Sequence, residues 1–221
     1  MDRVVATTVE LAGVTTVLLL VMATPLAWWL ARSPRWWKEI VGAVTAVPLV
    51  LPPTVIGFYL LLAMGPAGPL TAMLRPLGIG SLAFTFGGLV VGSLVYSLPF
   101  AVQPLRTAFA GVGQPALDLA ATMGAGPVDR FLSVGVPLAR RGFVAAAILV
   151  FAHTVGEFGI VLMIGGNIPG RTEVLSTRIY SLVESLQFGA AHRIAAGLVA
   201  FAFVALLALL LIDRRLGSVA R

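Results

Sequence analysis

The sequence predicts an all-α integral membrane protein that crosses the bilayer about five times. Of the 221 residues, 59% are hydrophobic and only 11% are charged, whereas roughly a quarter are charged in an ordinary globular domain. Five apolar segments are each long enough to cross the hydrocarbon layer, which takes about 20 helical residues. These segments are residues 11–31, 41–64, 82–105, 142–165 and 194–212.

The basic residues orient these spans, because cytoplasmic loops accumulate Lys and Arg. Ten of the fifteen fall on one side: Arg32, Arg35, Lys38, Arg106, Arg130, Arg140, Arg141, Arg214, Arg215 and Arg221. The other side holds Arg3, Arg75, Arg171, Arg178 and Arg193. The bias predicts an external N-terminus and a cytoplasmic C-terminus. It also explains the net charge of +6 as membrane orientation rather than nucleic-acid binding.

The first span is expected to be a retained anchor, and the chain carries no enzyme signature. The apolar run follows Asp2, Arg3 and Glu10 without a cleavage pattern. There is no cysteine, and the only lysine, Lys38, lies outside any phosphate-binding loop motif. The two histidines are far apart, and no carboxylates cluster in the sequence. We therefore expect no catalytic residue, metal site or cofactor in this chain.

The second and third predicted spans contain residues that interrupt or tighten helix packing. Pro48, Pro52 and Pro53 lie within the second span, where proline frees carbonyls that need other partners. A helix broken beside a pathway and a merely kinked helix both fit this pattern. The third span has Gly88 and Gly92, a spacing that permits close helix approach. Such pairs are common in glycine-rich helices, so they do not by themselves predict self-association.

The fourth predicted span holds one pair of ionisable residues. His153 and Glu157 are four residues apart and would share a face of a continuous helix. Ionisable side chains inside a membrane are costly and usually functional. A role in a pathway or gate and a mutually neutralised structural pair both remain open.

The connection over residues 114–141 is predicted to form a short helix, a turn and a second helix at the inner membrane face. Pro115 suits a first helical turn, and Asp118 falls near the positive end of the helix dipole. A break over residues 124–127 follows, and a second apolar piece ends at Pro137. This segment could press into a partner's groove or lie at the interface as an amphipathic helix.

This connection resembles the EAA loop of ABC importer permeases. The resemblance rests on Ala120, Ala121, Gly124 and Pro137, with Val134 and Val136 in place of the family's isoleucine and leucine. The chain departs from the family at the acidic position, where Leu119 stands and Asp118 lies one residue earlier. Residues 48–61 and 156–180 further resemble molybdate permeases, and their motifs occur with variation in sulfate and tungstate permeases. Molybdate is therefore the favoured substrate, with sulfate or tungstate as the near alternative.

The resemblance implies a type I ABC importer permease fold, built as a single transmembrane domain over residues 1–221 of a bacterial inner-membrane protein. It implies a homodimer, two ABC ATPase subunits that bind ATP and Mg, and an external oxyanion-binding protein. The ATPases would dock on the loop of residues 114–141. The translocation path or gate is expected at Pro52, Pro53, Thr54, His153, Glu157, Phe158 and Asn167.

No Arg or Lys lies inside the five predicted spans, so a dianion would meet no fixed, tight site and selectivity would reside mainly in the delivering protein. Backbone amides at the turn containing Asn167 could host the anion transiently.

Residues 172–187 place Leu175, Ile179, Leu182, Val183 and Leu186 on one helix face. This pattern predicts an external or re-entrant helix near the gate, or a plain interfacial helix.

An ion-coupled carrier and a membrane scaffold are the rival classes of function. The near absence of intramembrane acids disfavours the carrier, and the loop that resembles a coupling loop disfavours the scaffold.

Overall fold

The computed structural model describes residues 1–218, with side chains through residue 212, and all regular elements in that part are helical. The helices are α1 (Asp2–Arg32), α2 (Lys38–Ala46), α3 (Pro53–Met64), α4 (Pro69–Leu74), α5 (Phe86–Ala110), α6 (Gln114–Thr122), α7 (Pro127–Arg130), α8 (Val136–Leu138), α9 (Arg140–Gly156), α10 (Gly159–Gly165), α11 (Leu175–Glu184) and α12 (Phe188–Ser218). Turns of 3-10 helix cover Val47–Leu49 and Arg75–Leu77, and a π-helical stretch covers Phe131–Gly135.

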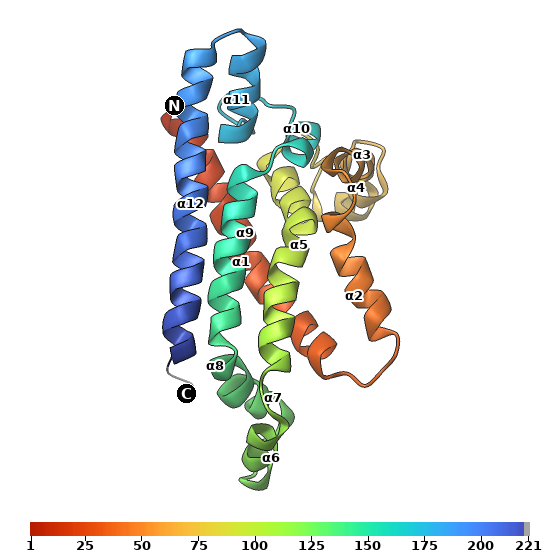
Figure 1. Ribbon diagram of the computed structural model, residues 1–221. Coiled ribbons are helices and arrows are strands. Elements are labelled where there is room, and N and C mark those ends of the chain that lie inside the picture. Colours follow the sequence, from red (N-terminus) through yellow and green to blue (C-terminus); the bar gives the residue numbers. More distant parts are fainter. Residues whose placement is uncertain (219–221) are drawn as a thin grey trace.

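Five helices run in alternating directions along the molecule: α1, α2, α5, α9 and α12 (Figure 1). The N-terminus and α11 lie at one end, and α6 to α8 lie at the other end together with the end of α12 (Figure 1). Three helices, α1, α5 and α12, meet the length and hydropathy of a span alone, and five spans result if each bent helix pair counts as one. The predicted all-α membrane fold is confirmed. The side chains of Arg214 and Arg215, and all of Arg221, lie outside the described residues.

The second predicted span is broken rather than kinked. The segment Lys38–Leu49 and helix α3 meet at an angle of 105°. Pro52 adopts an extended conformation with ψ 136°, and Pro53 has no N–H to continue a helical hydrogen-bond ladder. As a result, α3 lies across the external end of the bundle instead of completing a straight helix over residues 41–64.

The fourth predicted span is also interrupted. Helix α9 ends at Gly156, Glu157 is extended with ψ 129°, and Phe158 leads into the short helix α10. The first span is longer than predicted, since α1 begins at Asp2. These differences arise because hydropathy measures apolar length and contains no information on where the backbone turns.

The main core is formed where α1, α5 and α9 pack together. Its buried side chains include Leu19, Ala27, Leu105, Phe109 and Val150. A second core joins α3, α10 and α5 near the external end. Gly88 and Gly92 contribute there: a Cβ built on Gly92 would lie 2.6 Å from Ile164 Cδ1. The glycine pair therefore serves packing within this chain, between α5 and α10.

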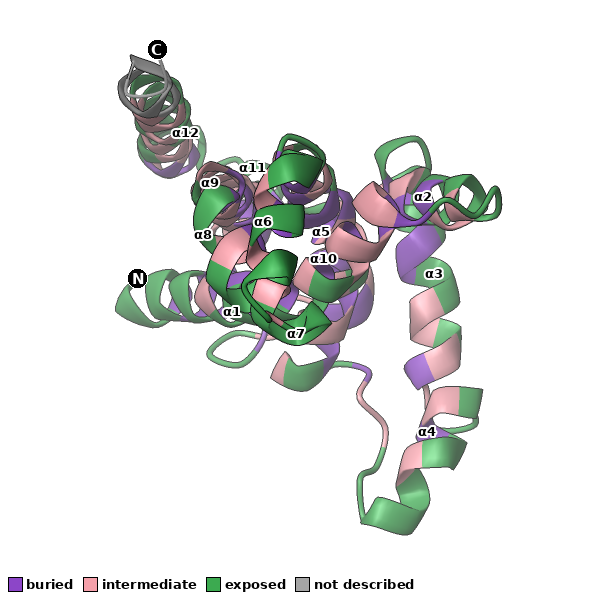
Figure 2. Ribbon diagram, turned by 90° about the horizontal axis from the view of Figure 1, so that it is seen from below, coloured by how far each residue is buried: buried purple, intermediate pink, exposed green. Residues whose placement is uncertain are grey.

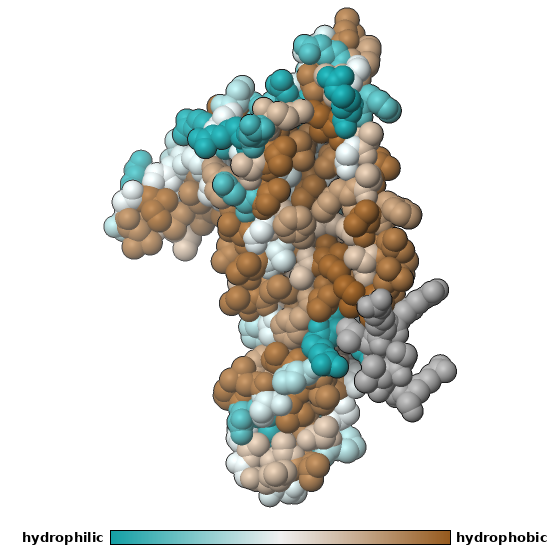
Figure 3. All heavy atoms as spheres, turned by 90° about the vertical axis from the view of Figure 1, so that its left-hand side faces the viewer, coloured by the Kyte–Doolittle hydropathy of each residue, from teal (hydrophilic) through white to brown (hydrophobic). Residues whose placement is uncertain are grey.

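Helix α12 stands apart from this bundle. Only 6% of its apolar window is buried, against 44% for α1 and 50% for α5, and the view along the bundle shows it well separated from α5 (Figure 2). The side view shows a broad hydrophobic band between hydrophilic residues at the external end and others near the C-terminus (Figure 3). This is the surface expected of a protein that faces lipid.

Helix α11 lies within the predicted segment of residues 172–187 and carries four of its five predicted apolar residues. Leu182 is buried and packs near Ala191 and Ile194 at the start of α12. Val183 is exposed on the helix itself. Leu186 lies beyond the helix end at Glu184 and adopts a left-handed conformation with φ 58°. The predicted helical face was therefore wrong at Leu186, which lies outside the helix.

Candidate coupling loop and translocation path

The cytoplasmic connection folds as the predicted helix, turn and helix. Pro115 lies in the first turn of α6, as predicted. Asp118 lies in the second turn rather than at the helix start, and its carboxylate accepts a hydrogen bond of 2.8 Å from Gln114 Nε2. The predicted dipole contact was therefore wrong, because α6 begins before Pro115. Ala120 and Ala121 lie in the last turn of the helix.

Gly124 ends this helix in a conformation that favours glycine. Its φ is +91°, a left-handed value that costs other residues about 1–2 kcal/mol. The turn is closed by hydrogen bonds of 3.0 Å from Gly124 N to the carbonyl of Ala121 and from Ala125 N to the carbonyl of Ala120. Such left-handed caps satisfy the free carbonyls at a helix end. The alanines and the glycine of the loop thus form one structural unit.

The second half of the loop is packed firmly onto the membrane helices. Phe131 stacks edge-on against Trp28 of α1 at 5.2 Å between ring centroids, and Trp28 contacts Phe109 at the same distance. A Cβ on Gly135 would lie 2.8 Å from the Trp28 ring. Val134 packs against the same core, and Val136 and Pro137 begin α8. Motion of the loop must therefore be shared by α1 and α5.

The tip of the loop exposes large apolar side chains beyond the membrane-spanning part of the bundle. The exposed residues are Leu119 at 64%, Met123 at 82%, Val128 at 69% and Leu132 at 59%. Leu119 lies on α6 and Met123 directly follows this helix, while Val128 lies on α7 and Leu132 in the π-helical stretch. These elements are at the inner end of the molecule (Figure 1). An apolar surface presented to the cytoplasm in this way is typical of a protein–protein contact.

At the external end, the two broken spans pack directly against each other. A Cβ built on Gly159 of α10 would lie 2.9 Å from Pro53 Cγ, and one on Gly57 of α3 would lie 2.9 Å from Met163 Cβ. The breaks after Leu49 and after Gly156 therefore come together in space. Pro52 and Thr54 are exposed beside this contact. Phe158 is 37% exposed and lies 5.3 Å from the Tyr180 ring.

Glu157 occupies the break between α9 and α10 and is only 3% exposed. Its Oε2 accepts a hydrogen bond of 2.8 Å from Ser93, and its main-chain carbonyl accepts one of 2.5 Å from Ser176. Its Oε1 is buried without a hydrogen-bond partner in the described part of the chain. This residue connects α5, the α9–α10 break and the start of α11.

His153 does not pair with Glu157. Its Nδ1 is 2.9 Å from the Ser97 hydroxyl, and its ring stacks on Phe100 at 4.0 Å between centroids. Since α9 ends at Gly156, the assumption that both residues share a helix face was wrong. Each of the two side chains instead bonds to a different serine of α5.

Asn167 lies at the opposite end of α10 from this break. Its φ is +51°, and its Nδ2 donates a hydrogen bond of 2.7 Å to Ser181 of α11. The sequence-predicted path residues thus divide into three places. Pro52, Pro53, Thr54 and Phe158 lie at or beside the contact between α3 and α10. The side chains of Glu157 and His153 bond to serines of α5, and Asn167 joins α10 to α11.

Comparison with known proteins places the chain in a transporter family. Residues 23–218 match the family of binding-protein-dependent transport system inner membrane components. The chain belongs to this family. It is 58% identical over 202 residues to the molybdenum transport system permease protein ModB of Azotobacter vinelandii, a match that covers 91% of this chain and 89% of the relative. The ModB of Escherichia coli K12 is 35% identical over 72% of this chain and 69% of its own.

Solved structures of ABC importers share the permease fold. A bacterial ABC transporter crystallised with an alginate-bound periplasmic protein aligns with a TM-score of 0.71 at 19% identity, covering 97% of this chain and 78% of that one. The inward-facing MetNI methionine transporter aligns with a TM-score of 0.71 at 18% identity, covering 97% and 95%. The protein is therefore an inner-membrane permease subunit with the fold of type I ABC importers.

Arg32 has a structural role in this permease that its sequence did not predict, since it counted there only as a cytoplasmic basic residue. Its guanidinium donates to the carbonyl of Phe109 at 3.1 Å, to the carbonyl of Val112, and to Gln114 Oε1 at 3.2 Å. It also lies over the Trp28 ring at 5.1 Å. Arg32 thus fastens the end of α1 to the start of the loop. The spacing of four residues between Trp28 and Arg32 could have predicted the contact between these two side chains.

Proposed function

We propose that this chain is the membrane-spanning subunit of an ATP-driven importer that carries molybdate into the bacterial cytoplasm. The main support is its identity of 58% over 91% of its length to a relative named for molybdenum transport. Residues 1–221 form one permease domain in this proposal. Sulfate or tungstate is the alternative substrate, because the motifs of residues 48–61 and 156–180 also resemble permeases for those anions.

Two separate ATPase subunits bind ATP and Mg, and one docks on the loop of each permease copy. The support is the exposed apolar tip formed by Leu119, Met123, Val128 and Leu132. These side chains are held on a rigid base, since Gly135 and Phe131 pack against Trp28. Asp118, Ala120, Ala121, Gly124, Val134, Val136 and Pro137 form the coupling element. ATP-driven closure of the ATPases would move α1 and α5 through this base.

A second copy of the chain covers the exposed apolar side chains of α2 and α3. Val44 and Ile40 on α2 and Phe58, Tyr59 and Leu62 on α3 are all more than 45% exposed. Both helices lie on the side of the bundle away from α12 (Figure 2). An external protein delivers the oxyanion to the path between the two copies. This path opens at the contact of Pro53 with Gly159.

Asn167 provides a direct test of the path. We expect Asn167→Ala to lower the uptake rate about fivefold, the effect of one lost hydrogen bond worth about 1 kcal/mol. Ser181→Ala is the matched control, because it removes the same hydrogen bond within the protein but leaves the amide available to an anion. Equal loss in both variants would indicate a purely structural role. Unchanged uptake by Asn167→Ala would exclude the side-chain amide of this residue from the path.

The proposed function is tested by uptake into vesicles that contain the permease, its co-purified ATPase and a candidate binding protein. We expect uptake of labelled molybdate that requires ATP, survives collapse of ion gradients and resists competition by excess sulfate. Competition by sulfate would favour sulfate as the substrate instead of molybdate. Uptake without ATP, or none from a folded complex, would contradict the importer and favour the carrier or scaffold class.

A further inference from the structure

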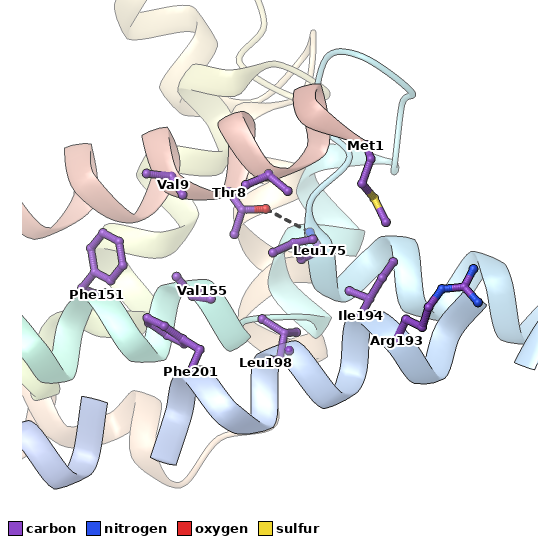
Figure 4. Close-up of a pocket in the computed structure, with 12 residues that line it drawn as sticks. Met1, Thr8, Val9, Phe151, Val155, Leu175, Arg193, Ile194, Leu198 and Phe201 are labelled. Carbon is purple, nitrogen blue, oxygen red and sulfur yellow. Dashed lines mark hydrogen bonds between the residues drawn. The ribbon is translucent and has the colours of Figure 1, made fainter. Parts of the chain in front are cut away.

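An apolar pocket of about 370 Å³ lies between α1, α9, α11 and α12 near the external end. Figure 4 shows Val9, Phe151, Leu198 and Phe201 around it. The one hydrogen bond drawn there, from Leu175 N to the Thr8 hydroxyl at 3.0 Å, satisfies a backbone donor, and the same hydroxyl donates to a carbonyl within α1. The pocket therefore offers an apolar ligand a surface on which the Thr8 hydroxyl and the Leu175 N–H are already paired.

A second apolar pocket of about 380 Å³ continues from the first toward the membrane centre. Both are lined by Phe151 of α9 and Phe201 of α12, so together they form one groove between α1, α9 and α12. Along α12 the groove runs from Arg193 to Ala208. A helical stretch of about fifteen residues rises about 22 Å, whereas half of the hydrocarbon layer is about 15 Å thick. The groove crosses a whole leaflet.

Arg193 is the only charged side chain along the described lining of this groove. It is exposed, makes no hydrogen bond or ion pair with another described residue, and extends from α12 at the outer end of the pocket (Figure 4). A guanidinium binds phosphate oxygens with two parallel hydrogen bonds. The groove thus combines a long apolar channel with a cation at the depth of the external head groups.

We propose that this groove binds an acyl chain of an anionic phospholipid from the external leaflet, with the lipid phosphate at Arg193. A lipid fits the site because α12 is barely packed on the bundle and the groove faces sideways into the bilayer. A second copy of the chain is a poorer occupant, since the exposed apolar residues of α2 and α3 lie on the other side (Figure 2). The bound lipid fills the space between α12 and α1.

The groove can be filled without a clash by substituting Gly197, which lines it and where an added Cβ would meet no atom within 4 Å. Gly197→Leu should place its side chain where the acyl chain lies. Ala196→Leu is the control, because Ala196 precedes Gly197 at the same depth, is exposed and lines neither pocket. Ala205→Leu blocks the deeper half and is the second variant if Gly197→Leu does not fold.

The experiment is native mass spectrometry of the complex purified in mild detergent, with added phosphatidylglycerol or phosphatidylcholine of identical chains. We expect retained phosphatidylglycerol on each permease chain, bound about fivefold more tightly than phosphatidylcholine, the order for one basic residue at an anionic lipid surface. Arg193→Gln should abolish this preference, Gly197→Leu should abolish retention of both lipids, and Ala196→Leu should change neither. Equal retention by folded Gly197→Leu and Ala205→Leu variants, or no lipid preference in the unaltered protein, would overturn the proposal.

Discussion

Gly124→Val is expected to reduce transport without unfolding the permease. Gly124 has a φ of +91°, and a left-handed conformation costs a residue with a side chain about 1–2 kcal/mol, more if it is β-branched. About 1.4 kcal/mol changes an equilibrium tenfold. The loop conformation that presents α6 to the ATPase should therefore become about five- to thirtyfold less populated. We expect uptake to fall by about this factor, while thermal unfolding of the permease changes little.

The small effect on folding follows from the position of Gly124. A Cβ there would meet no atom within 4 Å, so the cost is confined to the backbone of an exposed turn. Gly126→Val is the matched control. Gly126 is also free of neighbours, but its φ is −69°, which valine adopts without strain. Equal losses of uptake in the two variants would show that the left-handed turn is not the reason for the effect.

The number of spans and the cytoplasmic helix–turn–helix could be predicted from sequence because both depend on local composition. Apolar length indicates a span wherever it occurs, and Pro115 and Gly124 act on the backbone of their own turn. The side-chain contacts could not be predicted in this way. Arg32 is fixed by carbonyls of Phe109 and Val112, which lie far from it in the sequence. No periodicity within α1 contains that information.

Glu157 shows why a helical face is unreliable next to a backbone break. The four-residue spacing from His153 would place both side chains together only if α9 continued through Glu157. The helix ends one residue too early, and the carboxyl turns toward Ser93. Likewise, the prolines indicated an interruption of the second span, but the angle of 105° depends on how α3 packs against α10.

That packing leads to the second large expected effect, a graded loss of transport on enlarging Gly159. A Cβ at this position would lie 2.9 Å from Pro53 Cγ and 3.1 Å from Pro53 Cβ. The proline ring is rigid and begins α3, so the added atoms can be accommodated only if α3 moves away from α10. Overpacking of this kind costs about 1–3 kcal/mol. We expect Gly159→Ala to reduce uptake and Gly159→Val to abolish it.

The nearby Gly156 gives a sharp control. Gly156 lies on the other side of the break, and a Cβ there would meet no atom within 4 Å, so Gly156→Val should retain most of the transport activity. ATP hydrolysis by the assembled complex should persist in Gly159→Val, because the loop of residues 114–141 is at the opposite end of the molecule (Figure 1). If Gly159→Val transported normally while folded, the contact between α3 and α10 would not control the path, and the external opening would have to form elsewhere between the two permease copies.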